Sequence, residues 1–338
     1  MKKYIIRFVL IILIAFSILV LNFALMPKTE HGIMQARCMY SQPKDSIDVV
    51  MLGSSHIHCD INTALLWEDY GISAYDYSAA EQPLWITYYY LKEICKTQKP
   101  KVAVLDLYGP AHYKDDFQYE WLADNLFGFR FSLNKIRMMT SCLEFDQIDR
   151  FFPAFFSYHN NYKELANTNL LKDFFDARTE NETFKGYTPY FYVQEQTEPE
   201  IVPVGSGGLT PKSEIYLLRI INYCKENNIE LFLIVTPYIT NDADELVYNR
   251  IKEISSYEGI DFNSTNYDYS NMGLNFEDDF NDSSHLNYSG SCKFTKYLAD
   301  ELLSRFELED HRGDSYYDSW YKHCEIIDEL VTSQMGKQ

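Results

Sequence analysis

The chain has 338 residues, with 30 basic and 49 acidic side chains, and its formal net charge is −19. Apolar residues make up 46% and charged residues 23%, a composition typical of a folded protein with a sizeable core. The acidity and the lack of any stretch dense in Lys and Arg argue against nucleic-acid binding, because phosphate recognition needs a basic face. Zinc-ribbon and P-loop motifs are absent as well, which excludes those two classes.

The N-terminus contains a long apolar run over residues 8–26, interrupted only by Ser17 and Asn22. At the rise of an α-helix this run spans about 28 Å, close to the hydrocarbon thickness of a bilayer. A cleaved signal peptide has a shorter apolar region of about 7–15 residues and a cleavage site between small residues. The sequence therefore predicts an uncleaved signal-anchor, a single transmembrane helix over residues 1–27, rather than a cleaved signal.

The charges that flank this run predict its orientation in the cell membrane. Lys2, Lys3 and Arg7 precede the run, and all the acidic residues come after residue 28. Basic flanks stay on the cytoplasmic side, so we expect the N-terminus to be cytoplasmic and residues 28–338 to lie outside the cell.

The cysteines have no regular spacing, which favours free thiols over a disulfide framework. They are Cys38, Cys59, Cys95, Cys142, Cys224, Cys292 and Cys324.

Four apolar runs of strand length follow, each bounded by turn residues. They cover residues 48–52, 73–77, 102–107 and 230–235. In these runs the apolar residues are consecutive and do not alternate with polar ones. This pattern is typical of strands that are covered on both faces of a parallel sheet. Helical spacing of apolar residues falls between and after them, as in the stripe at Leu217, Ile220 and Ile221. Strands alternating with helices predict a doubly wound α/β fold with a mostly parallel sheet and right-handed crossovers.

Within residues 28–338, the alternation of predicted strands and helices is interrupted once. We expect the α/β core to comprise residues 46–110 and 205–306. Residues 111–204 contain an aromatic-rich segment and no buried-strand run, which indicates a mostly helical insertion. The remaining residues, 307–338, are predicted to contain a terminal helix around positions 316–331.

Gly53-Ser54-Ser55-His56 comes directly after the first predicted strand. Ligands of open α/β sheets bind beyond the carboxyl ends of the strands, so a hydroxyl at this point lies where substrates bind. Gly53 permits a tight turn, and a helix that starts after it directs free N–H groups at an anion. A serine becomes a nucleophile only with a base that is itself oriented by a third group.

Asp282-Ser283-Ser284-His285 stands immediately before the last predicted core helix. At this spacing Asp282 can orient one imidazole nitrogen of His285 while the other faces a serine. The order Ser, Asp, His along the chain is that of one known catalytic triad, although the G-x-S-x-G elbow is absent. Each motif alone also has a structural interpretation, as a polar turn or as a helix cap.

The two motifs together resemble the first and last conserved blocks of the SGNH/GDSL hydrolase superfamily. VVMLGSSH supplies the first block and DSSHLNYSG the last. The resemblance is closest to the membrane-anchored, exported branch, which includes alginate O-acetyltransferase-like proteins and the D-alanyl transfer protein of teichoic acid modification. It implies a three-layer, flavodoxin-like fold and the roles of Ser55 as nucleophile, His285 as base and Asp282 as the acid that orients it.

The two middle blocks of the family depart from its pattern here. Ser78 stands where the family has a glycine whose N–H binds the oxyanion, and a backbone donor from Ser78 is compatible with this role. The third block, residues 105–109, has no asparagine, although the family usually has one there. His56 is expected to line the pocket.

A metal site competes for some of the same residues. His56-Ile57-His58 has the spacing that places two imidazoles on one side of an extended segment. The side chains that can complete a cluster are Cys59, Asp60, His112 and His159. No second clustered pair appears, and the strands are too few for the barrel in which such sites usually occur. We therefore predict neither a metal nor another cofactor.

The resemblance implies a membrane-tethered serine acyltransferase or esterase that acts on a cell-envelope or secreted polysaccharide. It also implies a partner, a multi-pass membrane O-acyltransferase that supplies acyl groups from the cytoplasm. The alternative is an accessory protein that keeps the fold and binds glycan or a membrane partner. The missing asparagine favours this alternative, and the presence of Ser55, Asp282 and His285 opposes it.

Overall fold

The computed structural model describes residues 2–25, 31–115, 119–143, 181–200, 202 and 204–336. Within them, five parallel strands form one sheet in the order β2-β1-β3-β4-β5. The strands are β1 (Val49–Gly53), β2 (Ala74–Ser78), β3 (Val102–Asp106), β4 (Glu230–Val235) and β5 (Asp261–Ser264). The chain passes from β1 to β2 on one side and then to β3 on the other, so the topological switch point lies between β1 and β3.

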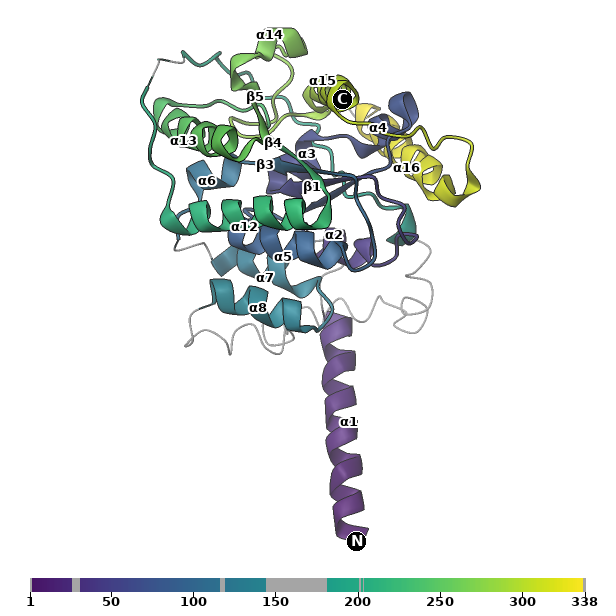
Figure 1. The fold of residues 1–338 in the computed structure, drawn as a ribbon. Coiled ribbons are helices and arrows are strands. Elements are labelled where there is room, and N and C mark those ends of the chain that lie inside the picture. The colour runs from purple at the N-terminus through teal and green to yellow at the C-terminus, as the bar shows by residue number, and fades with distance from the viewer. Residues whose placement is uncertain are drawn as a thin grey trace.

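Helices cover both faces of the sheet (Figure 1). The first face packs against α5 (Leu84–Ile94), α12 (Pro211–Asn227) and α13 (Asp242–Glu258), and the second against α3 (Ser55–Asp60) and α15 (Tyr288–Arg305). Side chains along β1 alternate between the two resulting cores, as they must in a strand. The predicted doubly wound α/β fold is thereby confirmed.

Further helices surround this three-layer core. They are α2 (Ile33–Met39), α4 (Thr63–Tyr70), α6 (Tyr108–His112), α7 (Tyr119–Phe127), α8 (Leu133–Cys142), α14 (Tyr269–Met272), α16 (Asp318–Met335) and the 3₁₀ turns η3 (Thr265–Tyr267) and η4 (Ser315–Tyr317). Helices α7 and α8 belong to the segment in which a helical insertion was expected. The aromatic-rich residues 151–156 of that segment lie outside the described residues. Helix α16 accounts for the helix expected near the C-terminus.

The two edges of the sheet differ. Strand β5 is polar and partly exposed, so it lacks the apolar run by which the other four strands are recognisable in the sequence. Strand β2 is fully buried although it is the other edge, because residues 185–187 lie against it. The Asp76 amide donates to the Lys185 carbonyl at 2.9 Å. A covered edge cannot pair with another chain.

Helix α1 (Lys2–Leu25) stands away from the α/β domain (Figure 1). Thirteen of its large apolar side chains are exposed, namely Tyr4, Ile5, Ile6, Phe8, Val9, Leu10, Ile11, Ile12, Leu13, Ile14, Phe16, Val20 and Leu21. Among the described residues, no helix combines the length and the hydropathy of a segment that crosses a membrane. The transmembrane assignment of residues 1–27 therefore has no support from the structure.

Candidate active site

The turn between β1 and α3 places Ser55 at the switch point of the sheet. Gly53 ends β1, Ser54 is the N-cap, and Ser55 begins α3. A Cβ atom at position 53 would lie 2.9 Å from the Asp106 Cβ, closer than real Cβ atoms approach one another. Glycine therefore allows the carboxyl ends of β1 and β3 to come together, and Ser55 reaches a partly exposed position beyond them.

A tight turn before α15 orients His285. The Asp282 Oδ1 atom accepts the amides of Ser284 and His285 at 2.8 and 2.9 Å. The same oxygen lies 3.1 Å from His285 Nδ1. The Asn281 amide donates to the His285 carbonyl at 2.9 Å and closes the turn. Because these contacts are local, the turn itself holds the imidazole against the carboxylate.

Ser55 and His285 are 230 positions apart in the chain, and the Ser55 Oγ lies 2.8 Å from His285 Nε2. The side chains of His285 and Asp282 are 19% and 39% exposed, so the group is accessible. Partial burial alone would raise the pKa of Asp282, but the hydrogen bond and charge of His285 and the Ser284 amide together lower it. An ionised carboxylate behind an imidazole that contacts a hydroxyl is the arrangement that activates a serine.

Asp60, the last residue of α3, joins the two halves of this group. Its Oδ1 atom accepts the Leu286 amide at 2.9 Å, and Leu286 directly follows His285. Asp60 is fully buried, and burial raises the pKa of its carboxyl well above the ordinary value. The bond fixes the His285 turn relative to the helix that begins with Ser55. The sequence indicates no such role for Asp60, since a contact across 226 positions leaves no local signal.

His56 lies behind the Ser55–His285 pair and is fully buried, so it does not line an open pocket. Its Nδ1 atom is 2.9 Å from Thr236 Oγ1 and 3.4 Å from Asp60 Oδ2. Its ring stacks on Tyr108 at 3.7 Å and lies 5.0 Å from the His285 ring. Burial, with the charges of nearby histidines, lowers the pKa of His56 well below its ordinary value, so the imidazole is neutral at pH 7.

Ser78 ends β2 and pairs in register with Gly53, which places it beside the turn that carries Ser55. Its hydroxyl is 2.9 Å from His58 Nδ1. Since the Ser78 side chain is buried and engaged in this way, a donor from Ser78 to an oxyanion would have to come from the main chain. Its part in an oxyanion hole stays a prediction.

Asp106 belongs to the third block, residues 105–109, in which the family usually has an asparagine. Its Oδ1 atom accepts the amide and hydroxyl of Thr236 at 3.1 and 3.2 Å, and its Oδ2 atom accepts the Tyr108 amide at 3.2 Å. Burial raises the pKa of Asp106 to about 6, although these hydrogen bonds lower it. The carboxyl therefore braces the ends of β3 and β4 and, when ionised, has no proton to donate to an oxyanion.

Two tyrosines that the sequence did not single out adjoin the His285 turn. The Tyr190 ring stands edge-on to the His285 ring at 5.5 Å. The Tyr108 hydroxyl is 3.3 Å from Ser284 Oγ, and its ring stacks between His56 and His112. Aromatic faces of this kind suit the apolar faces of sugar rings as well as acyl groups.

The metal interpretation receives no support from the described part of the chain. No three His, Cys, Asp or Glu side chains there are placed to hold a metal ion, and His159 lies outside it. His56 and His58 direct their Nδ1 atoms to hydroxyls on different strand ends, those of Thr236 and Ser78. The cysteines are free thiols.

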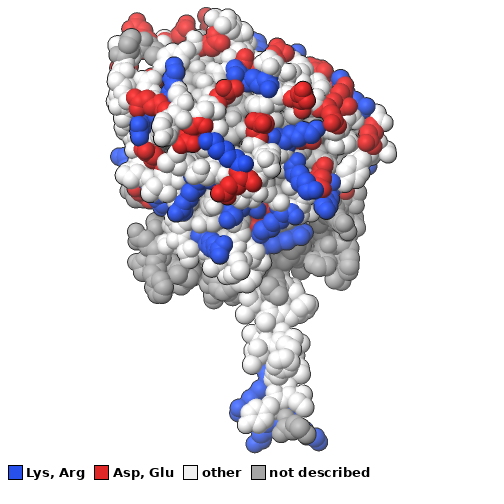
Figure 2. Space-filling model, viewed as in Figure 1, with Lys and Arg blue, Asp and Glu red and all other residues white. Residues whose placement is uncertain are grey.

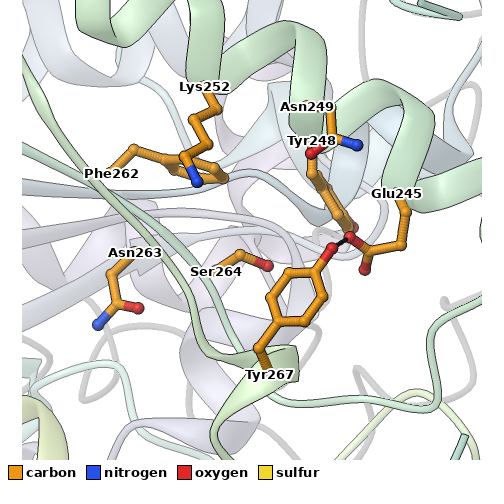
Figure 3. A pocket seen from close by; sticks show the side chains of 8 residues that line it. All are labelled: Glu245, Tyr248, Asn249, Lys252, Phe262, Asn263, Ser264 and Tyr267. Atoms are coloured by element: carbon orange, nitrogen blue, oxygen red, sulfur yellow. Dashed lines mark hydrogen bonds between the residues drawn. The ribbon is translucent and has the colours of Figure 1, made fainter. Parts of the chain in front are cut away.

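A separate hollow of about 260 Å³ lies between α13 and β5 (Figure 3). In it, the Tyr267 hydroxyl donates to the Glu245 carboxylate, which also accepts the Thr240 hydroxyl at 3.1 Å. None of the three residues Ser55, Asp282 and His285 lines this hollow. Its lining consists of Glu245, Tyr248, Asn249, Lys252, Phe262, Asn263, Ser264 and Tyr267.

Comparison with known proteins gives no information on the chemistry of the site. No family model matches the chain, and no curated protein matches its sequence significantly. The SGNH/GDSL resemblance therefore rests on the motifs around Ser55 and His285 alone.

Proposed function

We propose that this protein is a serine acyltransferase or esterase of the SGNH type. The observation that supports it is the hydrogen-bonded chain from Ser55 Oγ through His285 to Asp282, located at the switch point of a doubly wound sheet. The order of the three residues along the chain and their motifs agree with this family. The three side chains have the roles of nucleophile, base and orienting acid.

The reaction begins when Ser55 Oγ attacks an acyl carbonyl carbon and His285 Nε2 takes the hydroxyl proton. Asp282 stabilises the imidazolium that forms, because its carboxylate is ionised. His285 then returns the proton to the leaving oxygen, and the acyl group stays on Ser55. Water, or a hydroxyl of an acceptor, attacks the acyl-serine in a second round of the same proton transfers. Water gives an esterase and an acceptor hydroxyl gives a transferase.

The oxyanion that forms in each round needs hydrogen-bond donors. Amides in the first turn of a helix have no intrahelical acceptor, and Ser55 stands in the first turn of α3. The main chain of Ser78 at the adjacent strand end is a second source. The third block has no asparagine, and Asp106 supplies no donor in its ionised form, so we expect a slower reaction than an asparagine in this block would allow.

The substrate and the location are part of the same proposal. By its resemblance to the exported branch, the enzyme would act on a cell-envelope or secreted polysaccharide, beside a multi-pass O-acyltransferase. We propose that α1 tethers it to the cell membrane with the N-terminus in the cytoplasm and the domain outside. The support is the row of exposed apolar side chains on α1 and the basic residues at its start, since such a surface is unstable in water.

Labelling of the full chain with a fluorophosphonate probe tests the serine chemistry. The wild-type protein and the Ser54→Ala variant should be labelled, and Ser55→Ala should not. Ser54 is a matched control because it is the neighbouring hydroxyl and its side chain caps no helix amide. Equal labelling of the wild type and Ser55→Ala would reject Ser55 as the nucleophile.

One specific observation favours the accessory-protein alternative: the third block contains the acceptor Asp106 and no asparagine. On this alternative the domain binds glycan or a membrane partner without turnover. It predicts no probe labelling of the wild type under conditions that label a control esterase. It also predicts glycan binding that Ser55→Ala leaves unchanged.

A further inference from the structure

An exposed apolar surface lies at the start of α8 and in the turn before it. This α8 surface consists of Arg130, Phe131, Leu133, Ile136 and Arg137. Phe131 is 73% exposed, Leu133 71% and Ile136 39%. Grouped large apolar side chains at such exposure are uncommon on a protein surface that faces only water, and they mark an interaction site.

The local structure directs these side chains outward. Helix α8 packs on α5 through Asn134, whose amide donates to the Tyr89 carbonyl at 2.9 Å and to Glu93 at 2.7 Å. Met138, one turn further, is fully buried on the same side. Positions 133, 136, 137 and 140 have helical spacing and are all exposed. The helix therefore places its polar Asn134 inside and its apolar Leu133 outside.

The charge of the α8 surface is opposite to that of the protein. Residues 128–143 contain Arg130, Lys135 and Arg137 and no acidic residue, in a chain of net charge −19. The Arg130 guanidinium lies 4.3 Å from the Tyr40 ring centre, and its amide donates to the Tyr40 hydroxyl at 3.2 Å. This contact holds the turn and its cation in place. Among the described residues on the face shown in Figure 2, Lys and Arg are more frequent in the half of the domain toward α1, whereas Asp and Glu gather toward the opposite end.

The position of α8 in the molecule relates it to α1. Helices α7 and α8 lie at the end of the domain from which α1 projects, and α8 runs across the direction of α1 (Figure 1). Since α5 covers α8 from the side of the sheet, the exposed stripe of α8 faces away from the core. Apolar side chains flanked by cations on a helix of this orientation fit the interface of an anionic bilayer.

We propose that the α8 surface docks on an anionic lipid bilayer, with Phe131, Leu133 and Ile136 among the upper acyl chains and Arg130 and Arg137 on lipid phosphates. The inference rests on the proposed tether by α1 and adds a second point of attachment. A tether alone lets the domain rotate freely above the membrane, whereas two points fix which side of the domain faces the lipid. The domain then presents its substrate edge in one orientation.

Quenching of tryptophan fluorescence by brominated acyl chains measures this docking. Trp67, Trp85 and Trp320 are at most 1% exposed, so they are shielded from lipid. The probe protein is the full chain with Trp121→Phe and Phe131→Trp, which moves the one partly exposed indole onto the α8 surface. In vesicles of phosphatidylcholine with about one-third phosphatidylglycerol, brominated lipid should quench this tryptophan. Flotation of the same vesicles reports the tether by α1 independently.

Variants of the probe protein separate docking from anchoring. Leu133→Ser with Ile136→Ser should shift the docked equilibrium by about tenfold or more and abolish most of the quenching, while flotation is retained. Arg137→Glu should weaken quenching in the anionic vesicles and have little effect in pure phosphatidylcholine. Tyr257→Ser, at an 89% exposed position on α13 far from α1, is the matched control and should change neither readout.

Three other outcomes would contradict the docking proposal, and they can be distinguished from one another. Flotation without quenching of the probe, or quenching that survives Leu133→Ser/Ile136→Ser, rejects docking and leaves the tether in place. Failure to float rejects the tether and the docking together. Self-association of the wild type in detergent that Leu133→Ser/Ile136→Ser abolishes, without lipid quenching, would assign the α8 surface to a second copy of the chain.

Discussion

Two groups of histidine and aspartate lie within a few ångströms of each other and differ mainly in burial. In the outer group, Asp282 and His285 are partly exposed and form a chain with Ser55, and the pKa of Asp282 is lowered. In the inner group, His56 and Asp60 are fully buried, and burial lowers the pKa of the imidazole and raises that of the carboxyl. Burial therefore opposes a charge on both residues of the inner group, whereas the contacts of the outer group favour the charge on Asp282.

Because of this difference, the outer group is suited to proton transfer, whereas the inner group positions the residues around it. A proton transfer that forms an imidazolium needs an ionised partner, which the outer group has. The inner group instead links strand ends and helices through Thr236, Asp106 and the Leu286 amide. Variants in the outer group should change turnover with little change in stability, and variants in the inner group should change stability as well.

The largest effect is expected from the carboxylate of the outer group. Asp282→Asn should leave the fold intact and lower turnover by about 10⁴-fold, as the equivalent change does in serine proteases, with substrate binding much less affected. The measurement is the rate of acyl transfer or ester hydrolysis, together with thermal unfolding. His285→Ala should reduce the rate at least as much. An active His285→Ala variant would reject the catalytic triad. An unfolded Asp282→Asn variant would show that Asp282 is needed for the structure of the turn.

Asp60 should show the mixed effect of a positioning residue. Asp60→Ala leaves the buried Leu286 amide without its acceptor, which should cost about 1–3 kcal/mol of unfolding free energy. The displaced His285 turn should lower turnover by up to about 100-fold. Asp60→Asn keeps an acceptor oxygen for the Leu286 amide, so it should restore both quantities. A loss of stability in Asp60→Ala with unchanged turnover would show that Asp60 does not position His285.

Asp106 should make stability depend on pH. Its pKa is raised from the ordinary 3.8 to about 6, so the folded state holds the proton more tightly than the unfolded state does. Its contribution to stability is present below about pH 4 and is lost as the pH rises through about 6, with a total of about 3 kcal/mol. Urea unfolding between these pH values should show a decline in the wild type that is shallower in Asp106→Asn. Equal slopes would contradict the raised pKa.

The smallest effect is expected at Ser78. Ser78→Ala removes the contact with His58 and should cost about 1 kcal/mol of stability. Turnover should be almost unchanged if the main chain at this position serves the oxyanion. A loss of turnover of about 10²-fold or more at unchanged stability would show instead that the hydroxyl participates in the reaction.

Local patterns were sufficient to predict much of the fold. The strands β1 to β4 are recognisable because strands buried on both faces need continuous apolar runs. β5 was missed because an exposed edge strand such as Asp261–Ser264 does not need them. Within the candidate site, the contact of Asp282 with His285 was predictable, since residues three positions apart meet in a turn.

The sequence by itself determined the α/β class and the two motifs around Ser55 and His285, because both follow from neighbouring residues along the chain. Only the tertiary structure decided that Ser55 Oγ and His285 Nε2 lie within hydrogen-bonding distance. It also decided that Asp60 holds the Leu286 amide and that His56 is buried behind the pair. Contacts across more than 200 positions depend on the strand order of the sheet and on how α3 and α15 pack on it, and no local pattern encodes that packing.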